Sequence, residues 1–337
     1  MLVVMKNNAE EKDIAAVVEA IEALGFKARP IPGSNRTAIG TIGNTGQVDD
    51  TSIRGLDGIK EIVHITKPYK LASRDFHPAD TIVRIADSTF GANDFTIIAG
   101  PCSIESEEQI NKSAEFLSSK GVKILRGGAF KPRTSPYAFQ GLGVEGLKML
   151  AEAGHKNGMR VISEAIDIVS LEDVVEHSDI IQIGARNMQN FPLLKAAGKA
   201  SKPILLKRGL SATLDEMLLS AEYILNEGNQ NIIMCERGVR TFDNHSRNTL
   251  DITAVPVLQE KSHLPIIIDP SHATGNRKRV TPVSKAALAV GAHGLIVEVH
   301  PEPSKALSDG AQSLTFDQFD ELINELKPIA KVTGKKL

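Results

Sequence analysis

The chain has 337 residues, and its 39 Lys and Arg nearly balance its 41 Asp and Glu, leaving a formal net charge of −2. Since a typical domain has about 150 residues, this length predicts two domains, or one large α/β barrel with an appendage, and excludes a single small β-domain. The near-neutral charge and an aromatic content of 4% argue against a nucleic-acid-binding surface. Two cysteines, an early polar N-terminus and no apolar run long enough to span a bilayer predict a reduced, cytoplasmic protein without membrane insertion.

Residues 1–66 are expected to form a small ferredoxin-like domain. The pattern predicts a β-α-β-β-α-β order: a strand at 1–5, a helix that ends at Gly25, strands at 27–31 and 37–42, a loosely helical segment before Gly58, and a strand at 59–65. Residues 67–88 follow, with two prolines and no sustained period, and are expected to be a linker.

Residues 89–337 alternate short apolar runs with amphipathic stretches. The runs are FTIIAG at 95, VKILRGG at 122, RVISEA at 160, DIIQIGA at 179, PILLKRG at 203, NIIMCERG at 231, PIIIDPSH at 265 and GLIVEVH at 294. One helix between them begins with a capping box, Thr213 and Glu216. Eight strands that are apolar on both faces predict a closed (β/α)8 TIM barrel. The alternative, an open doubly wound sheet, lacks a GxGxxG after its first strand.

Chemically active side chains follow these runs. They are Cys102, Arg126, Glu164, Arg186, Lys207, Glu236, Arg237, Asp269, His272, Glu298 and His300. A (β/α)8 barrel brings its strand ends together on one face, where such enzymes keep their active sites. The simpler interpretation is that charge resumes wherever a strand surfaces. Repeated basic residues on one rim, Arg126, Arg186, Lys207 and Arg237, favour instead a small anionic substrate that carries phosphate or carboxylate groups.

A metal site is the second prediction at this rim. Cys102, His272, Glu298 and Asp309 offer a thiolate, an imidazole and two carboxylates, a set that suits Mn, Fe, Co or Zn better than Mg. The spacing leaves two alternatives open, because Cys102 could be a buried small hydrophobe and His272 a hydrogen-bonded loop histidine. Cys235 is assigned to the core.

Two loops complete the site predictions. KPRTSPYAFQG at 131 is stiffened by two prolines and carries Lys131, Arg133, Thr134 and Ser135, which could hold a phosphate. Residues 277–279, with the sequence RKR, are interpreted as a solvated turn.

The motifs now identify a resemblance. GPCSIES at 100, LRGGAFKPRTSPYAFQGLG at 125, IQIGARN at 181, LLKRG at 205, CERG at 235, DPSHATG at 269 and IVEVHPEP at 296 resemble the β-type 3-deoxy-7-phosphoheptulonate synthases. The related 3-deoxy-manno-octulosonate 8-phosphate synthases characteristically carry KANRSS where this chain has KPRTS. The resemblance therefore implies erythrose 4-phosphate, rather than arabinose 5-phosphate, as the acceptor.

The resemblance also implies roles for individual residues. Cys102, His272, Glu298 and Asp309 would bind one divalent metal ion, and metal-independent octulosonate enzymes carry Asn where Cys102 stands. The implied phosphoenolpyruvate ligands are Arg126, Lys131, Arg186, Lys207 and Arg237. Arg133 and Thr134 would bind the phosphate of the aldose, and Lys131 is the candidate proton donor in a condensation that Cys102 and His272 support through the metal.

The same resemblance implies feedback by an aromatic amino acid at the N-terminal domain and a homotetramer. A domain that only supports oligomer contacts is the alternative for residues 1–66. For the barrel, the alternatives are an octulosonate 8-phosphate synthase, a non-catalytic metabolite-binding barrel, and an aldolase with a Schiff-base lysine at Lys207.

Overall fold

The computed structural model describes residues 1–33, 36–44, 48–64, 68–132 and 135–337. These residues form two compact units, Met1–Ala79 and Asp80–Leu337, each described by itself below. The first carries an antiparallel sheet with a helix, and the second is a closed parallel barrel, so the predicted fold class is confirmed. Among the described residues, no helix combines the length and hydrophobicity needed to cross a membrane.

The first unit is a four-stranded antiparallel sheet in the order β2-β3-β1-β4, with one helix packed against it. Its elements are β1 (Leu2–Met5), α1 (Glu11–Ala23), β2 (Lys27–Pro32), β3 (Thr37–Ile42) and β4 (Ile59–Val63). Val17 and Ile21 of α1 are fully buried in one cluster with Val3, Met5 and Ile39 of the sheet. The helical spacing and the strand alternation thus meet in one apolar core.

The second helix expected before Gly58 is not formed by the described residues 48–58, which make turns instead. The amides of Ile53 and Arg54 both bond to the carbonyl of Asp50, at 3.0 and 2.8 Å, and the amide of Leu56 bonds to the carbonyl of Ile53 at 3.0 Å, so isolated turns form in place of a continuous helix. Gly55 and Gly58 follow at once, and glycine weakens further helical winding. Val48 and Ile53 are buried and Leu56 packs against the same cluster, so a few core side chains produced the apolar signal in this segment.

The barrel of the second unit contains all eight strands predicted from the apolar runs. They are β7 (Thr96–Gly100), β8 (Ile124–Arg126), β9 (Arg160–Ala165), β10 (Ile180–Ile183), β11 (Ile204–Lys207), β12 (Ile232–Glu236), β13 (Ile266–Ile268) and β14 (Gly294–Glu298). The barrel closes where β14 pairs with β7, and this register sets Glu298 opposite Gly100. The last strand therefore ends beside the end of the first.

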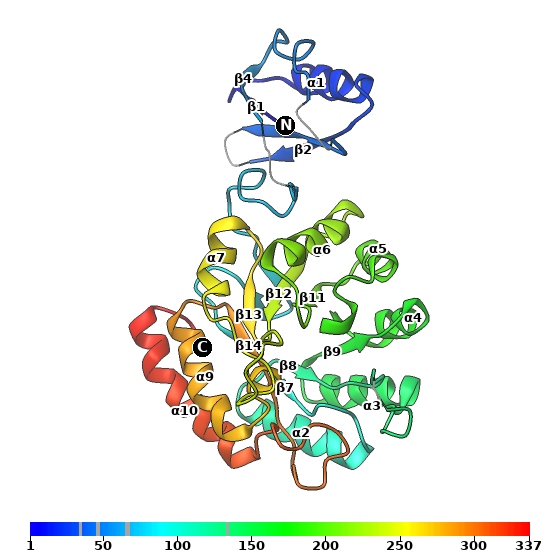
Figure 1. Ribbon diagram of the computed structural model, residues 1–337, viewed down its shortest axis with the longest axis vertical. Coiled ribbons are helices and arrows are strands. Elements are labelled where there is room, and N and C mark those ends of the chain that lie inside the picture. Colours follow the sequence, from blue (N-terminus) through cyan, green and yellow to red (C-terminus); the bar gives the residue numbers. More distant parts are fainter. Residues whose placement is uncertain (34–35, 45–47, 65–67, 133–134) are drawn as a thin grey trace. The chain divides into compact units, whose positions relative to one another are not determined.

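Helices surround the barrel (Figure 1). They are α2 (Glu107–Ser119), α3 (Gly143–Lys156), α4 (Ile168–His177), α5 (Phe191–Lys199), α6 (Leu214–Asn226), α7 (Ala254–Lys261), α8 (Pro270–Thr274), α9 (Arg277–Ala289) and α10 (Phe316–Thr333). A short 3-10 helix, η1 (Ala185–Asn187), follows β10. Thr213 and Glu216 form the predicted capping box at the start of α6, because each side chain bonds to the other's backbone amide.

A hairpin packs at the end of the barrel where the strands begin. Its strands are β5 (Val83–Ile85) and β6 (Ser88–Phe90), and Thr96 at the start of β7 donates its hydroxyl to the carbonyl of Thr89. Val83, Ile85 and Phe90 are buried in one cluster with interior residues of the barrel strands. The hairpin lies largely within the stretch 67–88 that the sequence assigned to a linker, and it belongs to the barrel unit.

Candidate metal centre and active site

Four of the predicted site residues meet at the carboxyl ends of the barrel strands. Cys102 follows β7, His272 lies in α8, Glu298 ends β14, and Asp309 lies in the segment after β14. One potential ligand atom from each of them lies within 4.8 Å of all the others. The turn that leads to Cys102 needs glycine: Gly100 has φ +150°, and a Cβ there would lie 2.1 Å from the carbonyl oxygen of Arg126.

The facing atoms of this cluster form a compact donor set. His272 Nε2 lies 3.3 Å from Glu298 Oε1 and 3.7 Å from Asp309 Oδ2. Cys102 Sγ lies 3.4 Å from Asp309 Oδ2. Glu298 Oε1 is buried and accepts no hydrogen bond, which is costly for a carboxylate oxygen unless a cation satisfies it. The residues present therefore fit a divalent metal with mixed sulfur, nitrogen and oxygen ligands.

The electrostatics of the cluster favour a bound cation. Burial and the nearby Glu298 raise the pKa of the Cys102 thiol to about 12, so an uncompensated thiolate is strongly disfavoured there. Burial lowers the pKa of His272, which keeps the ring neutral. His272 Nδ1 lies 2.7 Å from Asp269 Oδ2, and a proton held between these atoms leaves Nε2 as a lone-pair donor.

Asp269 joins this cluster to the neighbouring cations. Although burial opposes it, the electrostatic attraction and hydrogen bond of His272 and the charge of Lys207 hold the pKa of Asp269 well below its usual range. Lys207 Nζ donates to Asp269 Oδ2 at 2.5 Å, the same oxygen that faces His272. One buried carboxylate therefore orients a residue of the metal cluster and a residue of the basic rim.

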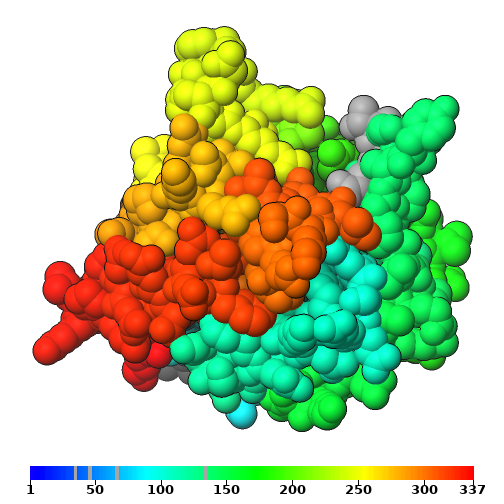
Figure 2. Space-filling view, turned by 90° about the horizontal axis from the view of Figure 1, so that it is seen from below, coloured from blue at the N-terminus to red at the C-terminus, as the bar shows by residue number. Residues whose placement is uncertain are grey.

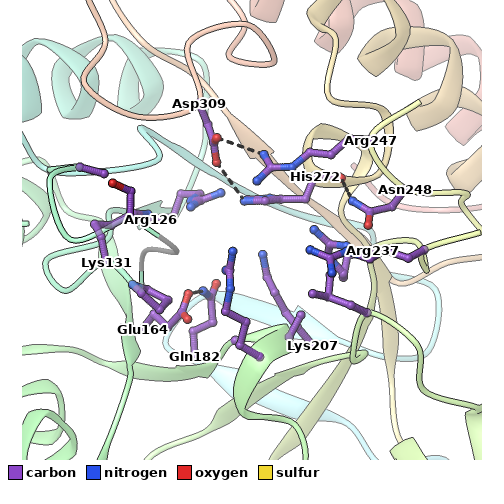
Figure 3. A pocket seen from close by; sticks show the side chains of 18 residues that line it. Arg126, Lys131, Glu164, Gln182, Lys207, Arg237, Arg247, Asn248, His272 and Asp309 are labelled. Atoms are coloured by element: carbon purple, nitrogen blue, oxygen red, sulfur yellow. Dashed lines mark hydrogen bonds and ion pairs between the residues drawn. The ribbon is translucent and has the colours of Figure 1, made fainter. Parts of the chain in front are cut away.

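A polar cavity of about 380 Å³ opens beside the cluster. Basic side chains dominate its lining: Arg126, Lys131, Arg186, Lys207, Arg237, Arg240 and Arg247. Figure 3 shows several of them around one open space, with His272 and Asp309 at its edge. The five basic residues expected to hold phosphoenolpyruvate are all in this lining.

Several of these cations are buried before any ligand arrives. Arg126, Lys207 and Arg237 expose 5% or less of their residue surface. Arg126 Nη1 is buried without a hydrogen-bond partner, although it lies 3.1 Å from Glu298 Oε1. Lys131 Nζ donates to the carbonyl oxygen of Cys102 at 2.9 Å and contacts Cys102 Sγ at 3.1 Å. Unused donors in a confined cavity are suited to an anion with several oxygens.

Comparison with known proteins agrees with this geometry. Residues 79–332 match the model of the DAHP synthetase I family, and residues 1–67 match the DAHP synthase ferredoxin-like domain. The chain belongs to the DAHP synthetase I family. It is 55% identical to the phospho-2-dehydro-3-deoxyheptonate aldolase of Thermotoga maritima over 337 residues, which cover 100% of both chains.

Two further relatives of this DAHP synthetase I family chain are informative. A crystal structure of a Thermotoga maritima DAHP synthase superposes with a TM-score of 0.80 at 55% identity, covering 99% of this chain and 98% of the other. A 2-dehydro-3-deoxyphosphooctonate aldolase of Syntrophotalea carbinolica is 34% identical over 269 residues, which are 74% of this chain and 96% of the relative. The octulosonate-type relative thus leaves about a quarter of this chain unmatched.

The other residues that the sequence singled out lie near the cavity, in the barrel interior or outside the described residues. Arg133 and Thr134 lie outside the described residues, whereas Lys131 and Ser135 on either side of them line the cavity. Cys235 is buried in the barrel interior, as predicted. His300 is not in the metal cluster, and its Nε2 lies 3.4 Å from Glu105 Oε2.

One prediction near the DAHP synthetase I family site is wrong, and two residues of the site were missed. The predicted solvated turn at 277–279 is the first turn of α9, and Arg277 donates to the carbonyl of Gly310 at 2.7 Å. Arg247, which no strand-end pattern singles out, lies 3.0 Å from Asp309. Gln312 was also missed, and it donates to Glu298 at 2.7 Å. The sequence offers no periodic signal for either residue, because both lie in irregular segments.

Proposed function

We propose that this chain is a 3-deoxy-7-phosphoheptulonate synthase, which condenses phosphoenolpyruvate with erythrose 4-phosphate and water and releases inorganic phosphate. The observation that carries the proposal is a thiol, imidazole and carboxylate cluster directly beside a cavity lined by buried cations. The relative from Thermotoga maritima, which matches over the full length of both chains, supports this reaction over the octulosonate one.

Cys102, His272, Glu298 and Asp309 would hold one divalent ion, either Mn, Fe, Co or Zn. When bound, the ion supplies a Lewis acid that polarises the aldehyde of the acceptor. The protein's contribution is to keep the four donor atoms together and Glu298 Oε1 free of hydrogen bonds.

The basic rim would bind phosphoenolpyruvate through its phosphate and carboxylate. Arg126, Lys207 and Arg237 are buried, so their charges are already oriented and little reorganisation accompanies binding. Arg186, on η1, and Lys131 line the same cavity and complete the set. Arg133 and Thr134 remain our candidates for the phosphate of erythrose 4-phosphate.

Lys131 is placed to handle the proton of the carbon–carbon bond-forming step. The methylene carbon of the enol attacks the aldehyde carbon, and the electron pair of the C=O bond moves to the aldehyde oxygen. Lys131 Nζ, which lies beside Cys102 Sγ, would donate a proton to that oxygen. Water then adds to the oxocarbenium carbon, and the phosphohemiketal breaks its carbon–oxygen bond to release phosphate.

The first unit would regulate the enzyme by binding an aromatic amino acid. The match of residues 1–67 to the DAHP synthase ferredoxin-like domain supports this proposal. The test removes residues 1–79, the whole first unit, and titrates tyrosine and phenylalanine against both forms. Inhibition of the full-length chain alone is the expected result, whereas a full-length chain that neither amino acid inhibits would leave the unit with a role in oligomer contacts, such as those of a homotetramer.

A phosphate-release assay tests the proposed reaction. Metal-free protein is supplied with phosphoenolpyruvate and either erythrose 4-phosphate or arabinose 5-phosphate, before and after addition of Mn²⁺, Fe²⁺, Co²⁺ or Zn²⁺. We expect turnover only with erythrose 4-phosphate and only with metal. Preference for arabinose 5-phosphate would identify an octulosonate synthase, and no turnover with either aldose would identify a binding protein. Borohydride should trap no Schiff base at Lys207.

A further inference from the structure

We propose that Arg247 and Gln312 form a positioning pair that fixes how the two carboxylates of the metal centre present their oxygens. Each residue engages one oxygen of a carboxylate, so that only the other oxygen faces the metal. The pair would thereby set the affinity of the site and its coordination number. This inference rests on the metal binding in the proposed function.

Gln312 holds the carboxylate of Glu298. Its Nε2 donates to Glu298 Oε2 at 2.7 Å, and both side chains are buried. The other oxygen, Oε1, is the one that lies 3.3 Å from His272 Nε2 and accepts no hydrogen bond. The amide therefore occupies one oxygen of Glu298 and leaves the second for a cation.

Arg247 does the same for Asp309. Its Nη1 lies 3.0 Å from Asp309 Oδ1, whereas Oδ2 faces His272 Nε2 (Figure 3). Oδ2 also lies 3.4 Å from Cys102 Sγ. The same Nη1 donates to Gln312 Oε1 at 2.8 Å. The guanidinium and the amide therefore form one continuous link between the two carboxylates.

Hydrogen bonds from the neighbouring residue attach Arg247 to α8, the helix that carries His272. The amide of Asn248 bonds to the carbonyl of Ala273 at 2.8 Å, and its side chain donates to the carbonyl of His272 at 2.7 Å. Gly275 permits this close approach, because a Cβ there would lie 2.6 Å from Arg247 Cβ. Asn248 thus bonds to α8 through its backbone amide and its side chain, and Arg247 contacts Asp309 through its guanidinium.

The segment that carries Asp309 and Gln312 is also held from outside the site. Asp309 has φ +52°, a conformation that non-glycine residues adopt at a cost unless the surroundings maintain it. Arg277 donates to the carbonyl of Gly310, and its amide bonds to the carbonyl of Ala311 at 3.1 Å. In Figure 2 this orange segment lies on the surface against the light-orange and yellow segments.

One-oxygen binding by both carboxylates has a chemical consequence. The protein then offers four atoms, which are Sγ, Nε2, Oε1 and Oδ2, and leaves further positions on the metal for water or substrate. Zinc and its neighbours accept such a small set, whereas calcium takes six to eight oxygens and often binds a carboxylate through both. The pair therefore favours a transition metal over calcium. Residues that orient ligands in this way typically change metal affinity about 10–100-fold when removed.

The test is a Co²⁺ titration of metal-free, full-length protein, followed by the visible spectrum and by the thiolate absorption that Cys102 ligation produces. We expect Gln312→Met and Arg247→Met each to weaken Co²⁺ binding about 10–100-fold. We also expect their cobalt bands to become weaker, as they do when a carboxylate binds through both oxygens and the coordination number rises. Arg247→Lys, which keeps the charge and one donor, should restore part of the affinity.

Arg240→Met is the matched control. Arg240 lines the same cavity, and no ion pair or side-chain hydrogen bond joins it to a carboxylate within the described residues. This variant removes one positive charge from the cavity without touching the pair, so the Co²⁺ affinity and spectrum should stay as in the wild type. An equal loss in Arg240→Met would show that any change in the cavity lining weakens the site, whether or not the residue contacts a carboxylate, and would overturn the proposal.

The double variant Arg247→Met/Gln312→Met adds a direct test of coupling. Because the two side chains bond to each other, the losses should be less than additive. Wild-type affinity and spectrum in both single variants would overturn the positioning role and leave the proposed function intact. A wild-type chain that binds none of Mn²⁺, Fe²⁺, Co²⁺ and Zn²⁺ would instead overturn both the positioning role and the proposed function. If a Met variant does not fold, as judged by circular dichroism, Arg247→Lys is measured instead. An affinity and cobalt spectrum between those of the wild type and a lost site would support the positioning role, and wild-type values would overturn it.

Discussion

The two ends of the barrel bury different kinds of side chain, apolar at one end and charged at the other. At the end where the strands begin, the β5–β6 hairpin adds Val83, Ile85 and Phe90 to the apolar interior. At the other end, charged groups such as Arg126 and Glu298 are buried beside one another. Apolar burial stabilises the fold by about 25 cal/mol per Å², whereas buried charges carry a desolvation cost. One end of the barrel therefore supports the fold, and the other is specialised for binding charge.

Cys102→Ala should have the largest effect on turnover, because it removes the proposed sulfur ligand from the charged end. We expect no measurable metal-dependent phosphate release. Cys235→Ala is the control, since it removes the other buried thiol, which packs in the barrel interior. Activity of metal-free Cys102→Ala at the wild-type rate would contradict the proposed metal centre.

Lys131→Met should lower kcat by about 10²–10⁴-fold, the usual contribution of a positioned proton donor. The loss should fall mainly on kcat, with a smaller change in KM, because in the proposed function the other cations would still bind phosphoenolpyruvate. Lys148→Met, an exposed lysine paired with Glu145 on α3, serves as the control for steady-state kinetics. A purely structural Lys131 would give a Tm shift with an unchanged kcat.

Phe90→Ala tests whether the apolar end of the barrel contributes to stability without affecting turnover. Removing this fully buried ring should lower the free energy of unfolding by about 3–5 kcal/mol, measured by denaturant titration. Below the unfolding transition, kcat should match the wild type, because Phe90 lies at the end of the barrel away from the charged groups. Lost turnover in a chain shown to be folded would break the division between the two ends.

The smallest expected signal comes from the thiol of Cys235. Burial raises the pKa of this thiol, so almost no reactive thiolate forms at neutral pH. In the Cys102→Ala chain, where Cys235 is the remaining cysteine, a thiol reagent should react only after a denaturant is added. Rapid reaction in buffer would mean that the barrel interior opens more readily than its packing suggests.

The sequence predicted the charged end well wherever a residue follows a strand. Cys102, Lys207 and Glu298 were found because parallel strands in a barrel end on one face. Arg247 and Gln312 were not found, because they lie in irregular segments and are 65 positions apart in the chain. Only the folded chain brings the guanidinium and the amide together.

The first unit shows the opposite limit. Its sheet follows from strand patterns that the structure retains, but the apolar spacing before Gly58 suggested a second helix that the described residues do not form. A few core side chains, Val48, Ile53 and the partly buried Leu56, are enough to imitate a helical face over so short a window. The hairpin β5–β6 was missed for a related reason, since three-residue strands are too short to show alternation.

The pairing of Glu298 with Gly100 places the proposed metal ligands on both sides of the seam where the barrel joins its own beginning. Cys102 follows the earliest strand of the barrel, and Glu298 belongs to the strand synthesised last. In the proposed function, a cation could be held by all four ligands only after Asp309 has also been synthesised. Bound metal would then indicate that both strands of this seam, β7 and β14, have been synthesised and paired.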